Sequence, residues 1–444
     1  MGAADLRARV REVMPRVREA HARLVRIPSL SAAGHDPAPV RQSAALTAEL
    51  LRGIGAEART LEAKGGHPAV VGRIAGPAGS RTVLLYAHHD VQPPGPDSRW
   101  SSPPFEPVER DGRVFGRGTS DDKAGIAAHL AAVLAHGGKP PCTVLFFIEG
   151  EEESGSKHLR GLLEGERERL RCDAVVIADS GNWRIGQPAL TTTLRGVVDC
   201  VAEVTVLDHA VHSGGYGGIF PDAVTCLARI LATLHDDQGR VAVRGIAARD
   251  ADPLDLTEDE LRAWTGARPG LRTIGEGSFT SRMWTRPAIS VIGVDAPSVH
   301  DSSNQLVPAA RARVSMRIPP GQPAKAALDA LCAHLREAAP WGAEVKVTPG
   351  SAGEPFVAST KGPAYDAMHA ALADAWGRKA LDIGIGGSIP FLADFAELFP
   401  EAELLVTGVG DPSSNAHSED ESLHLADFEN VCVAEARFLE LFAR

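Results

Sequence analysis

Three apolar, β-prone runs in the first half of the chain each end in acidic or histidine residues. Thr82-Val-Leu-Leu-Tyr-Ala87 is followed by His88-His89-Asp90, Thr143-Val-Leu-Phe-Phe-Ile148 by Glu149-Gly-Glu-Glu-Glu153, and Ala174-Val-Val-Ile-Ala178 by Asp179. Short, continuous apolar runs are typical of strands buried on both faces of a parallel sheet. Because ligands bind at the carboxyl ends of strands in open α/β sheets, the three endings predict one shared site of carboxylates and imidazole.

Helical stretches separate the strand-like runs. Strands are predicted at residues 69–74, 82–87, 143–148 and 174–178, and the main helical stretch between them spans residues 124–136. A further amphipathic helix is predicted at residues 43–52, with Ser43 as its N-cap. The alternation predicts an α/β fold in which a mostly parallel sheet is flanked by helices.

The pattern changes after Arg195 and returns after Pro355. Between them, the sequence predicts strands at 197–206, 289–293, 312–318 and 344–347 and helices at 222–234 and 324–335, which together form a smaller α+β unit. A chain of 444 residues is also too long for one ordinary core. We therefore expect a catalytic domain in two segments, residues 1–196 and 355–444, with an inserted α+β lid and dimerisation domain over residues 197–354.

Composition narrows the classes of partner. A formal net charge of -11 disfavours nucleic acid and anionic membranes, because both would repel an acidic surface. No stretch approaches the roughly 18 apolar residues of a membrane span. The six cysteines are scattered without a close pair, which favours buried thiols over disulfides or a thiolate zinc site. We expect a cytoplasmic protein.

The acidic and histidine clusters contain every part of a two-metal hydrolytic centre. His88 follows a strand, and Asp90 could hold its imidazole by accepting from the other ring nitrogen. Asp121, in the loop Gly116-Arg-Gly-Thr-Ser-Asp-Asp-Lys123, is the candidate for the carboxylate that bridges two ions. In the run Glu151-Glu-Glu153, one glutamate could bind metal while its neighbour acts as the base. The charges of two Zn²⁺ balance with Asp121, Glu153, Asp179 and a hydroxide, and His88 and one more histidine would be neutral ligands.

Seven motifs occur in the order found in a family of dizinc metallopeptidases, and the chain resembles that family from about Leu24 to His417. The family includes aminoacylase, acetylornithine deacetylase, succinyl-diaminopimelate desuccinylase, glutamate carboxypeptidase and carnosine-type dipeptidases, and the chain looks most like the dipeptidase branch. The motifs are His88-His-Asp90, Gly116 to Lys123, Glu149-Gly-Glu-Glu-Glu-Ser-Gly155, Asp179, His212-Ser-Gly-Gly215, Gly386-Gly-Ser-Ile-Pro390 and Ala416-His-Ser418.

The resemblance implies a role for each matching residue. His88 and Asp179 would bind one zinc ion, Glu153 and His417 the other, and Asp121 would bridge them, although Co²⁺ or Mn²⁺ could replace Zn²⁺. Glu152 would be the general base, and Asp90 would orient His88. The family also implies a homodimer in which His212 reaches into the partner subunit's site to stabilise the oxyanion. Arg317 would bind the substrate carboxylate, and further substrate contacts would come from Asn304, Gly387 and Ser388.

One departure from the family pattern affects the substrate. Dipeptidases that recognise a free amine carry Arg-Glu before the Gly-Gly-Ser-Ile-Pro motif, whereas this chain has Gly384-Ile385. An isoleucine can neither accept a hydrogen bond nor balance an ammonium charge. The leading expectation is a dipeptidase or exopeptidase acting on a small peptide with a free carboxylate. The alternatives are an N-acyl amino acid amidohydrolase and a non-catalytic binding protein that keeps the fold.

Overall fold

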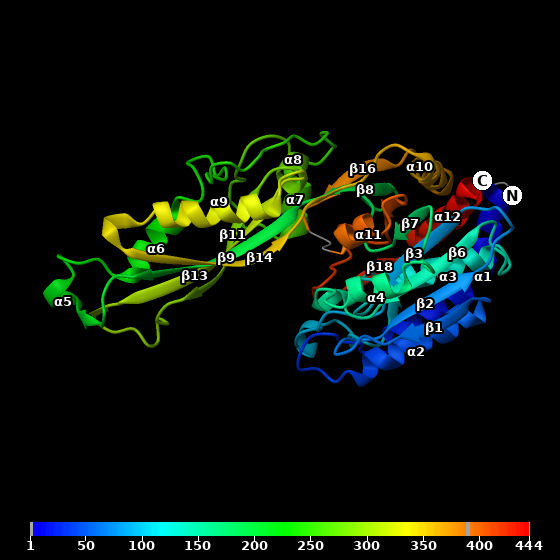
Figure 1. Ribbon diagram of the computed structural model, residues 1–444, viewed down its shortest axis with the longest axis horizontal. Coiled ribbons are helices and arrows are strands. Elements are labelled where there is room, and N and C mark those ends of the chain that lie inside the picture. Colours follow the sequence, from blue (N-terminus) through cyan, green and yellow to red (C-terminus); the bar gives the residue numbers. More distant parts are fainter. Residues whose placement is uncertain (1–2, 388–390, 444) are drawn as a thin grey trace. The chain divides into compact units, whose positions relative to one another are not determined.

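The structure is a computed structural model that describes residues 3–387 and 391–443 (Figure 1). The chain forms two compact units. Unit 1 comprises Met1–Thr192, Ala358–Ile383 and Phe391–Arg444, and unit 2 comprises Thr193–Val357 and Gly384–Pro390. Unit 2 is therefore built from one long segment placed between the segments of unit 1, together with a short glycine-containing segment that follows much later in the sequence.

The sheet of unit 1 has the strand order β1-β2-β6-β3-β7-β17-β8. Its members are β1 (Glu57–Leu61), β2 (Ala69–Ile74), β3 (Thr82–His88), β6 (Thr143–Glu149), β7 (Ala174–Ile177), β8 (Ala189–Leu194) and β17 (Glu403–Val406). The central strands β6, β3, β7 and β17 are parallel to one another, and β1, β2 and β8 pair in antiparallel fashion at the edges. The predicted α/β fold with a mostly parallel central sheet is confirmed.

Helices bury both faces of the central strands of this sheet, which explains why β3, β6 and β7 are almost entirely apolar. Alternate residues of β3, such as Val83 and Leu85, join the core formed with five helices on one face. Tyr86 points to the other face, where its ring lies 4.6 Å from that of Phe391 and 5.4 Å from that of Phe395. The five helices are α1 (Ala3–Val25), α2 (Ala38–Gly53), α3 (Lys123–Ala135), α10 (Pro363–Trp376) and α12 (Leu425–Phe442), whereas α11 (Leu392–Leu398) and α4 (Leu159–Glu166) belong to the second face.

The helix predicted at residues 43–52 begins earlier, at Ala38, directly after Pro37. Ser43 is therefore not an N-cap. It lies inside α2, is fully buried, and its hydroxyl donates to the carbonyl oxygen of His89 at 3.1 Å. Ser29 donates to the same carbonyl at 2.7 Å, so two hydroxyls fix the backbone just beyond the end of β3.

Unit 2 contains a four-stranded antiparallel sheet in the order β11-β13-β9-β14. These strands are β9 (Gly196–Thr205), β11 (Ala288–Asp295), β13 (Ala309–Ile318) and β14 (Glu344–Gly353). Helices α6 (Ala223–Ala232) and α9 (Ala324–Glu337) pack on one face and bury alternate residues of β9 and β13. Strand β11 forms one edge and is exposed over most of its length.

Shorter elements complete the two units. In unit 1 a small sheet joins β18 (Ser422–His424), β5 (Arg113–Phe115) and β4 (Val108–Arg110), and β16 (Leu381–Ile385) pairs with β8. In unit 2, β10 (Val211–His212) pairs with β12 (Gln305–Leu306), and β15 (Phe356–Val357) pairs with the end of β8. The remaining helices of unit 2 are α5 (Ser213–Tyr216), α7 (Glu258–Thr265) and α8 (Phe279–Trp284), and short 3-10 turns occur at Asp97–Arg99, Glu152–Ser154 and Pro340–Gly342.

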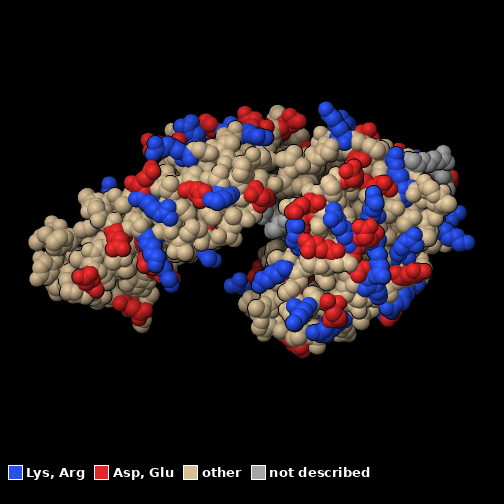
Figure 2. Space-filling view, viewed as in Figure 1, with Lys and Arg blue, Asp and Glu red and all other residues tan. Residues whose placement is uncertain are grey.

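The cysteines and the apolar character of the helices can also be described. All six cysteines are buried and free. None of the helices in the described part of the chain is both long enough and apolar enough to cross a membrane. On the face drawn in Figure 2, acidic and basic side chains are interspersed over most of both units.

Candidate metal centre

The three strand endings identified in the sequence meet at one edge of the unit 1 sheet. β3 lies between β6 and β7, and His88, the last residue of β3, is paired in register with Glu149, the last residue of β6. Glu152 and Glu153 follow in a 3-10 turn, and Asp179 lies two residues beyond the end of β7. Parallel pairing therefore brings these side chains together, because the carboxyl ends of parallel strands share one edge.

Two loops from distant parts of the sequence add Asp121 and His417 to the same edge. Asp121 lies in the loop before α3 and follows a glycine-rich stretch in which Gly116 and Gly118 have positive φ. His417 lies in the loop between β17 and β18, where Asn415, His417 and Asp420 also adopt positive φ. Non-glycine residues with positive φ are uncommon and are concentrated at functional sites, where the surrounding structure holds them.

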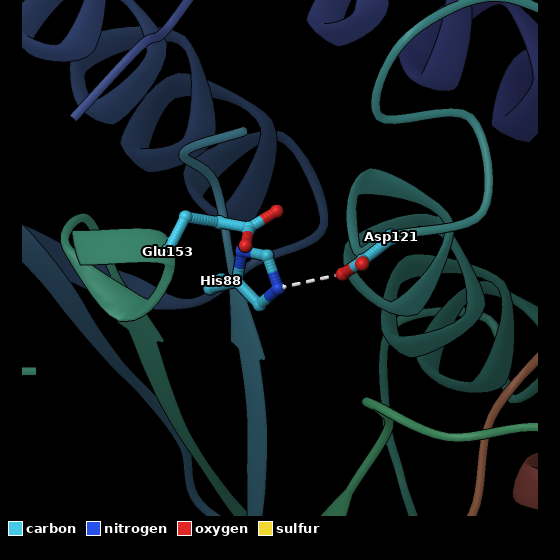
Figure 3. Close-up of side chains that lie close together, drawn as sticks. All are labelled: His88, Asp121 and Glu153. Atoms are coloured by element: carbon cyan, nitrogen blue, oxygen red, sulfur yellow. Dashed lines mark hydrogen bonds and ion pairs between the residues drawn. The ribbon is translucent and has the colours of Figure 1, made fainter. Parts of the chain in front are cut away.

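Asp121 lies between the two histidines. Its Oδ1 is 3.0 Å from Nε2 of His88, and its Oδ2 is 3.0 Å from Nε2 of His417. On the His417 side, Oε2 of Glu153 is 3.2 Å from the same nitrogen, and on the His88 side, Oδ1 of Asp179 is 3.9 Å from Nε2. Figure 3 shows His88, Asp121 and Glu153, with the contact between His88 and Asp121 dashed.

In the described residues, two groups of side chains have possible metal-ligand atoms close enough together to hold a cation. One consists of His88, Asp121 and Glu153, and the other of His88, Glu152 and Asp179, with the ligand atoms of each group within 4.8 Å of one another. Imidazole nitrogen and carboxylate oxygen are donors that suit Zn²⁺, Co²⁺ and Mn²⁺. The residues of both groups therefore fit a divalent cation, and His88 belongs to each group.

Asp90 connects His88 to the glutamate turn. Its Oδ1 is 3.4 Å from Nδ1 of His88, and its two oxygens accept from the backbone N–H groups of Glu152 at 3.2 Å and Glu153 at 3.0 Å. Nδ1 of His88 also lies 3.1 Å from the carbonyl oxygen of Asp90. Asp90 therefore fixes both the imidazole ring and the turn that presents the two glutamates.

The pKa values of the cluster reflect a surplus of negative charge. Burial and repulsion from the carboxylate of Glu152 raise the pKa of Asp179 well above its usual value. Burial, followed by repulsion from Glu153 and Asp90, raises the pKa of Glu152 to about 7 against the opposing effect of His88. Hydrogen bonds to Asp121 and Glu153 raise the pKa of His417 to about 10. Divalent cations would neutralise this charge directly.

The remaining predicted site residues belong to unit 2. His212 ends β10 and is exposed, and its neighbour Ser213 donates its backbone N–H to the carbonyl of Asn304 at 3.0 Å. Arg317 lies on β13 opposite Ala288, is half-buried, and has its pKa lowered by burial. Gly387 follows β16, and Ser388 lies outside the described residues. The structure therefore pairs His212 with Gln305, the residue after Asn304, and places Arg317 and Gly387 elsewhere in unit 2.

Two buried carboxylates outside the predicted set of site residues support the cluster. Asp122, fully buried beside Asp121, accepts the backbone N–H of His88 at 3.2 Å. Glu421, four residues after His417, is also fully buried and accepts from the loop that carries Asp121. Adjacency to Asp121 hinted at the first, but no local pattern marked the second, because its partners lie about 300 residues away.

Comparisons with known proteins identify the family of the chain. The model of the family described as "Peptidase family M20/M25/M40" matches residues 84–441. The chain is 36% identical over 372 residues to a cysteinylglycine-S-conjugate dipeptidase from Corynebacterium striatum, covering 82% of this chain and 81% of that protein. Among solved structures, the di-peptidase Dug1p from Saccharomyces cerevisiae superposes with a TM-score of 0.83 at 22% identity, covering 99% and 98% of the two chains. Human carnosine dipeptidase 1 superposes with a TM-score of 0.82 at 24% identity, covering 99% and 98%. The chain belongs to peptidase family M20/M25/M40, as a metal-dependent peptidase of the dipeptidase branch.

Proposed function

We propose that the protein hydrolyses the peptide bond of a dipeptide with a free C-terminal carboxylate, using two divalent cations, most simply Zn²⁺. The observation that carries the proposal is the position of Asp121, whose two oxygens each lie 3.0 Å from a different histidine nitrogen. One ion would be held by His88, Asp179 and Asp121, and the other by His417, Glu153 and Asp121. When bound, the ions would polarise the scissile carbonyl and lower the pKa of the attacking water.

Glu152 is the proposed general base. Its Oε2 lies 4.0 Å from Nε2 of His88, so it borders the cluster, and Asp90 accepts its backbone N–H and fixes the turn. Glu152 would accept a proton from the attacking water and return it to the leaving amine.

Unit 2 would supply the substrate contacts. Arg317 would bind the substrate carboxylate, Asn304, Gly387 and Ser388 would contact the substrate, and His212 would donate to the developing oxyanion from the partner subunit of a homodimer. Exposed apolar side chains support a dimer through unit 2: Ile292 and Val294 on β11 are 60% and 56% exposed. Tyr216, Ile219 and Phe220, close after His212 in the sequence, are exposed as well.

The substrate class follows from the relatives and from Ile385. The name of the Corynebacterium striatum relative points to cysteinylglycine S-conjugates, in which a further group is attached to the cysteine sulfur. Ile385 provides an apolar side chain in the segment where amine-recognising dipeptidases have a glutamate. We propose that the protein is cytoplasmic and encounters such peptides there.

The same segment supports N-acyl amino acid deacylation as a second candidate. Arg195 donates its Nε–H to the carbonyl of Gly386 at 3.3 Å, so the fixed charge beside this segment is positive. Burial and the nearby Arg317 lower the pKa of Arg195 to about 10, which still leaves it charged at neutral pH. A positive charge disfavours a substrate ammonium and tolerates a neutral acyl group.

A substrate panel on protein loaded with Zn²⁺, Co²⁺ or Mn²⁺ tests the proposal. The panel contains Cys-Gly, an S-alkyl Cys-Gly, β-Ala-His, the amidated form of each dipeptide, and N-acetyl and longer N-acyl amino acids. We expect cleavage of the dipeptides, loss of turnover with their amides, and inactivation by a chelator that added metal reverses. Faster cleavage of the N-acyl amino acids would favour the second candidate, and metal-loaded protein inactive on the whole panel would contradict both.

A further inference from the structure

Glu421 is a buried carboxylate that is not part of the metal cluster but contacts the loop that forms it. It directly precedes β18, has 0% relative exposure, and lies four residues beyond His417. Its Oε1 accepts from the backbone N–H groups of Ser120 at 2.9 Å and Asp121 at 3.0 Å, and from the Ser120 hydroxyl at 3.1 Å. Its Oε2 accepts from the backbone N–H of Gly118 at 2.9 Å and from Arg117 at 2.7 Å.

These five donors require an ionised acceptor. A carboxylate offers about four lone-pair sites and no donor, so five donors use its full capacity. Three of them are backbone N–H groups within one four-residue stretch, an arrangement that forms an anion-binding concavity. Arg117, itself only 1% exposed, supplies the balancing positive charge. Glu421 is therefore held in place by its donors and has no free oxygen for an ion.

Glu421 also joins the loop of Asp121 to the loop of His417. Its backbone carbonyl accepts the N–H of Gly116 at 2.9 Å, at the start of the Asp121 loop. The next residue, Ser422, donates its N–H to the carbonyl of Ser414 at 2.8 Å, within the loop that carries His417. Glu421 and Ser422 thus connect the two loops whose side chains, Asp121 and His417, meet at 3.0 Å.

We propose that Glu421 is a positioning residue of the metal centre, whose buried carboxylate fixes the backbone of Asp121 and thereby sets the affinity of the site for divalent cations. The inference rests on the proposed function, because it requires Asp121 to bind metal. Residues that orient metal ligands through hydrogen bonds typically change metal affinity by about 10- to 100-fold when they are replaced.

Glu421→Gln is the direct test. The glutamine side chain has an NH₂ group in place of one carboxylate oxygen, and this group cannot accept a hydrogen bond. In either orientation of the amide the NH₂ group faces at least two of the five donors, so the Asp121 loop must shift. We expect Zn²⁺ and Co²⁺ affinity, measured by chelator competition, to fall about 10- to 100-fold. The visible absorption spectrum of the Co²⁺-loaded protein should change too, because it reports the geometry of the ligands.

Glu435→Gln is the matched control. Glu435 is a buried carboxylate on α12 that bonds Nδ1 of His129 at 2.8 Å, away from the metal loops. Its replacement should lower the unfolding temperature while leaving Co²⁺ affinity and spectrum unchanged. If Glu421→Gln does not fold, Ser120→Ala removes only one of the five donors and should lower the affinity about twofold to tenfold.

The outcomes separate this inference from the proposed function. The inference would be overturned, and the proposed function would stand, if the wild-type protein binds two ions and Glu421→Gln differs from it only in a lower unfolding temperature. In that case the variant would have the same metal affinity and the same Co²⁺ spectrum as the wild type. An unchanged affinity in Ser120→Ala would overturn it if the first variant cannot be made. Wild-type protein that binds no divalent ion would overturn both.

Discussion

Asp121 has the most constrained position of the residues in the cluster. Its two carboxylate oxygens face different histidines, and its backbone N–H is bonded to Glu421. Burial alone would raise the pKa of Asp121, but hydrogen bonds from His417 and His88 outweigh burial and hold that pKa below its usual range. A carboxylate that stays ionised between two imidazoles is suited to bridging two cations.

The neighbouring glutamates have different surroundings, and this difference supports the roles proposed for them. Oε2 of Glu153 lies 3.2 Å from Nε2 of His417, and Gln92 donates its backbone N–H to Oε1 and its side-chain N–H to Oε2. Glu152 has a longer contact, 4.0 Å to His88. The side chain held from several directions fits a ligand, and the side chain with fewer contacts fits a proton carrier.

Replacing Glu152 by glutamine should separate metal binding from catalysis. We expect Glu152→Gln to bind two ions with near wild-type affinity, because the proposed ligands are intact, and to lose about 10²- to 10⁴-fold in kcat, because an amide cannot accept the proton. Metal content and initial rates on a cleaved dipeptide check this. Glu164→Gln, an exposed change on α4, serves as the control with unchanged rates. Wild-type turnover in Glu152→Gln would rule out the base assignment.

At the scale of elements, β11 is an edge strand of unit 2 whose exposed apolar side chains support the proposed dimer. It is an eight-residue edge strand, and on its outer side the backbone hydrogen-bonding groups are available to another chain. Edge strands of monomers usually carry charges or bulges that block such pairing. β11 has a register shift between Val291 and Gly293 but carries apolar side chains around it. An exposed apolar edge of this kind is typical of an interface between subunits.

Charges on this edge should prevent the proposed dimer. We expect the double variant Ile292→Lys, Val294→Lys to sediment as a monomer in analytical ultracentrifugation at concentrations where wild type is dimeric, because lysines at a buried apolar interface lack partners. If His212 acts from the partner subunit, the monomer should lose turnover while retaining both ions. The control is Val357→Lys on β15, a valine with the same 56% exposure as Val294. A fully active monomer would contradict the role of His212 across the interface.

At the scale of the whole molecule, the metal cluster joins parts of unit 1 that the sequence separates. His88, Asp121, Glu153 and Asp179 precede the long segment of unit 2, and His417 follows it. Ions bound only by the folded arrangement stabilise it against unfolding in proportion to the logarithm of their concentration. Metal binding should therefore raise the unfolding temperature of unit 1 as well as enable catalysis.

Metal affinity should increase with pH. In the ion-free protein the pKa of His417 is about 10, so its ring holds a proton at neutral pH that an ion must displace. The ion-bound state then carries fewer protons than the free state, and the apparent association constant should rise about tenfold per pH unit for each proton released between pH 6 and 9. Chelator competition at several pH values measures this slope.

Histidine variants identify the source of this slope. His369→Gln should leave it unchanged, because that histidine bonds Asp382 at 2.9 Å outside the cluster. His417→Gln should reduce the slope by one proton, together with a loss of affinity. An affinity that does not depend on pH would contradict the protonated state of the free site.

The sequence by itself determined the fold class and the three strand endings, because buried parallel strands produce continuous apolar runs that can be recognised locally. It did not reveal β1 or the true start of α2. Glu57–Leu61 is mostly exposed and polar, and Ser43 looked like a cap although its hydroxyl bonds the distant His89. Family resemblance pointed to His417, since nothing local distinguishes that histidine from the others in the chain.

Only the tertiary structure showed how these residues support one another. The five hydrogen bonds of Glu421, the bond of Asp122 to His88, and the contact of Asp121 with both histidines join residues from 33 to about 300 positions apart. Such pairs leave no periodic or local trace in a sequence, because burial and hydrogen bonding depend on distance in space. The residue types of the site could therefore be recognised in the sequence, whereas the hydrogen bonds that connect them had to be found in the folded chain.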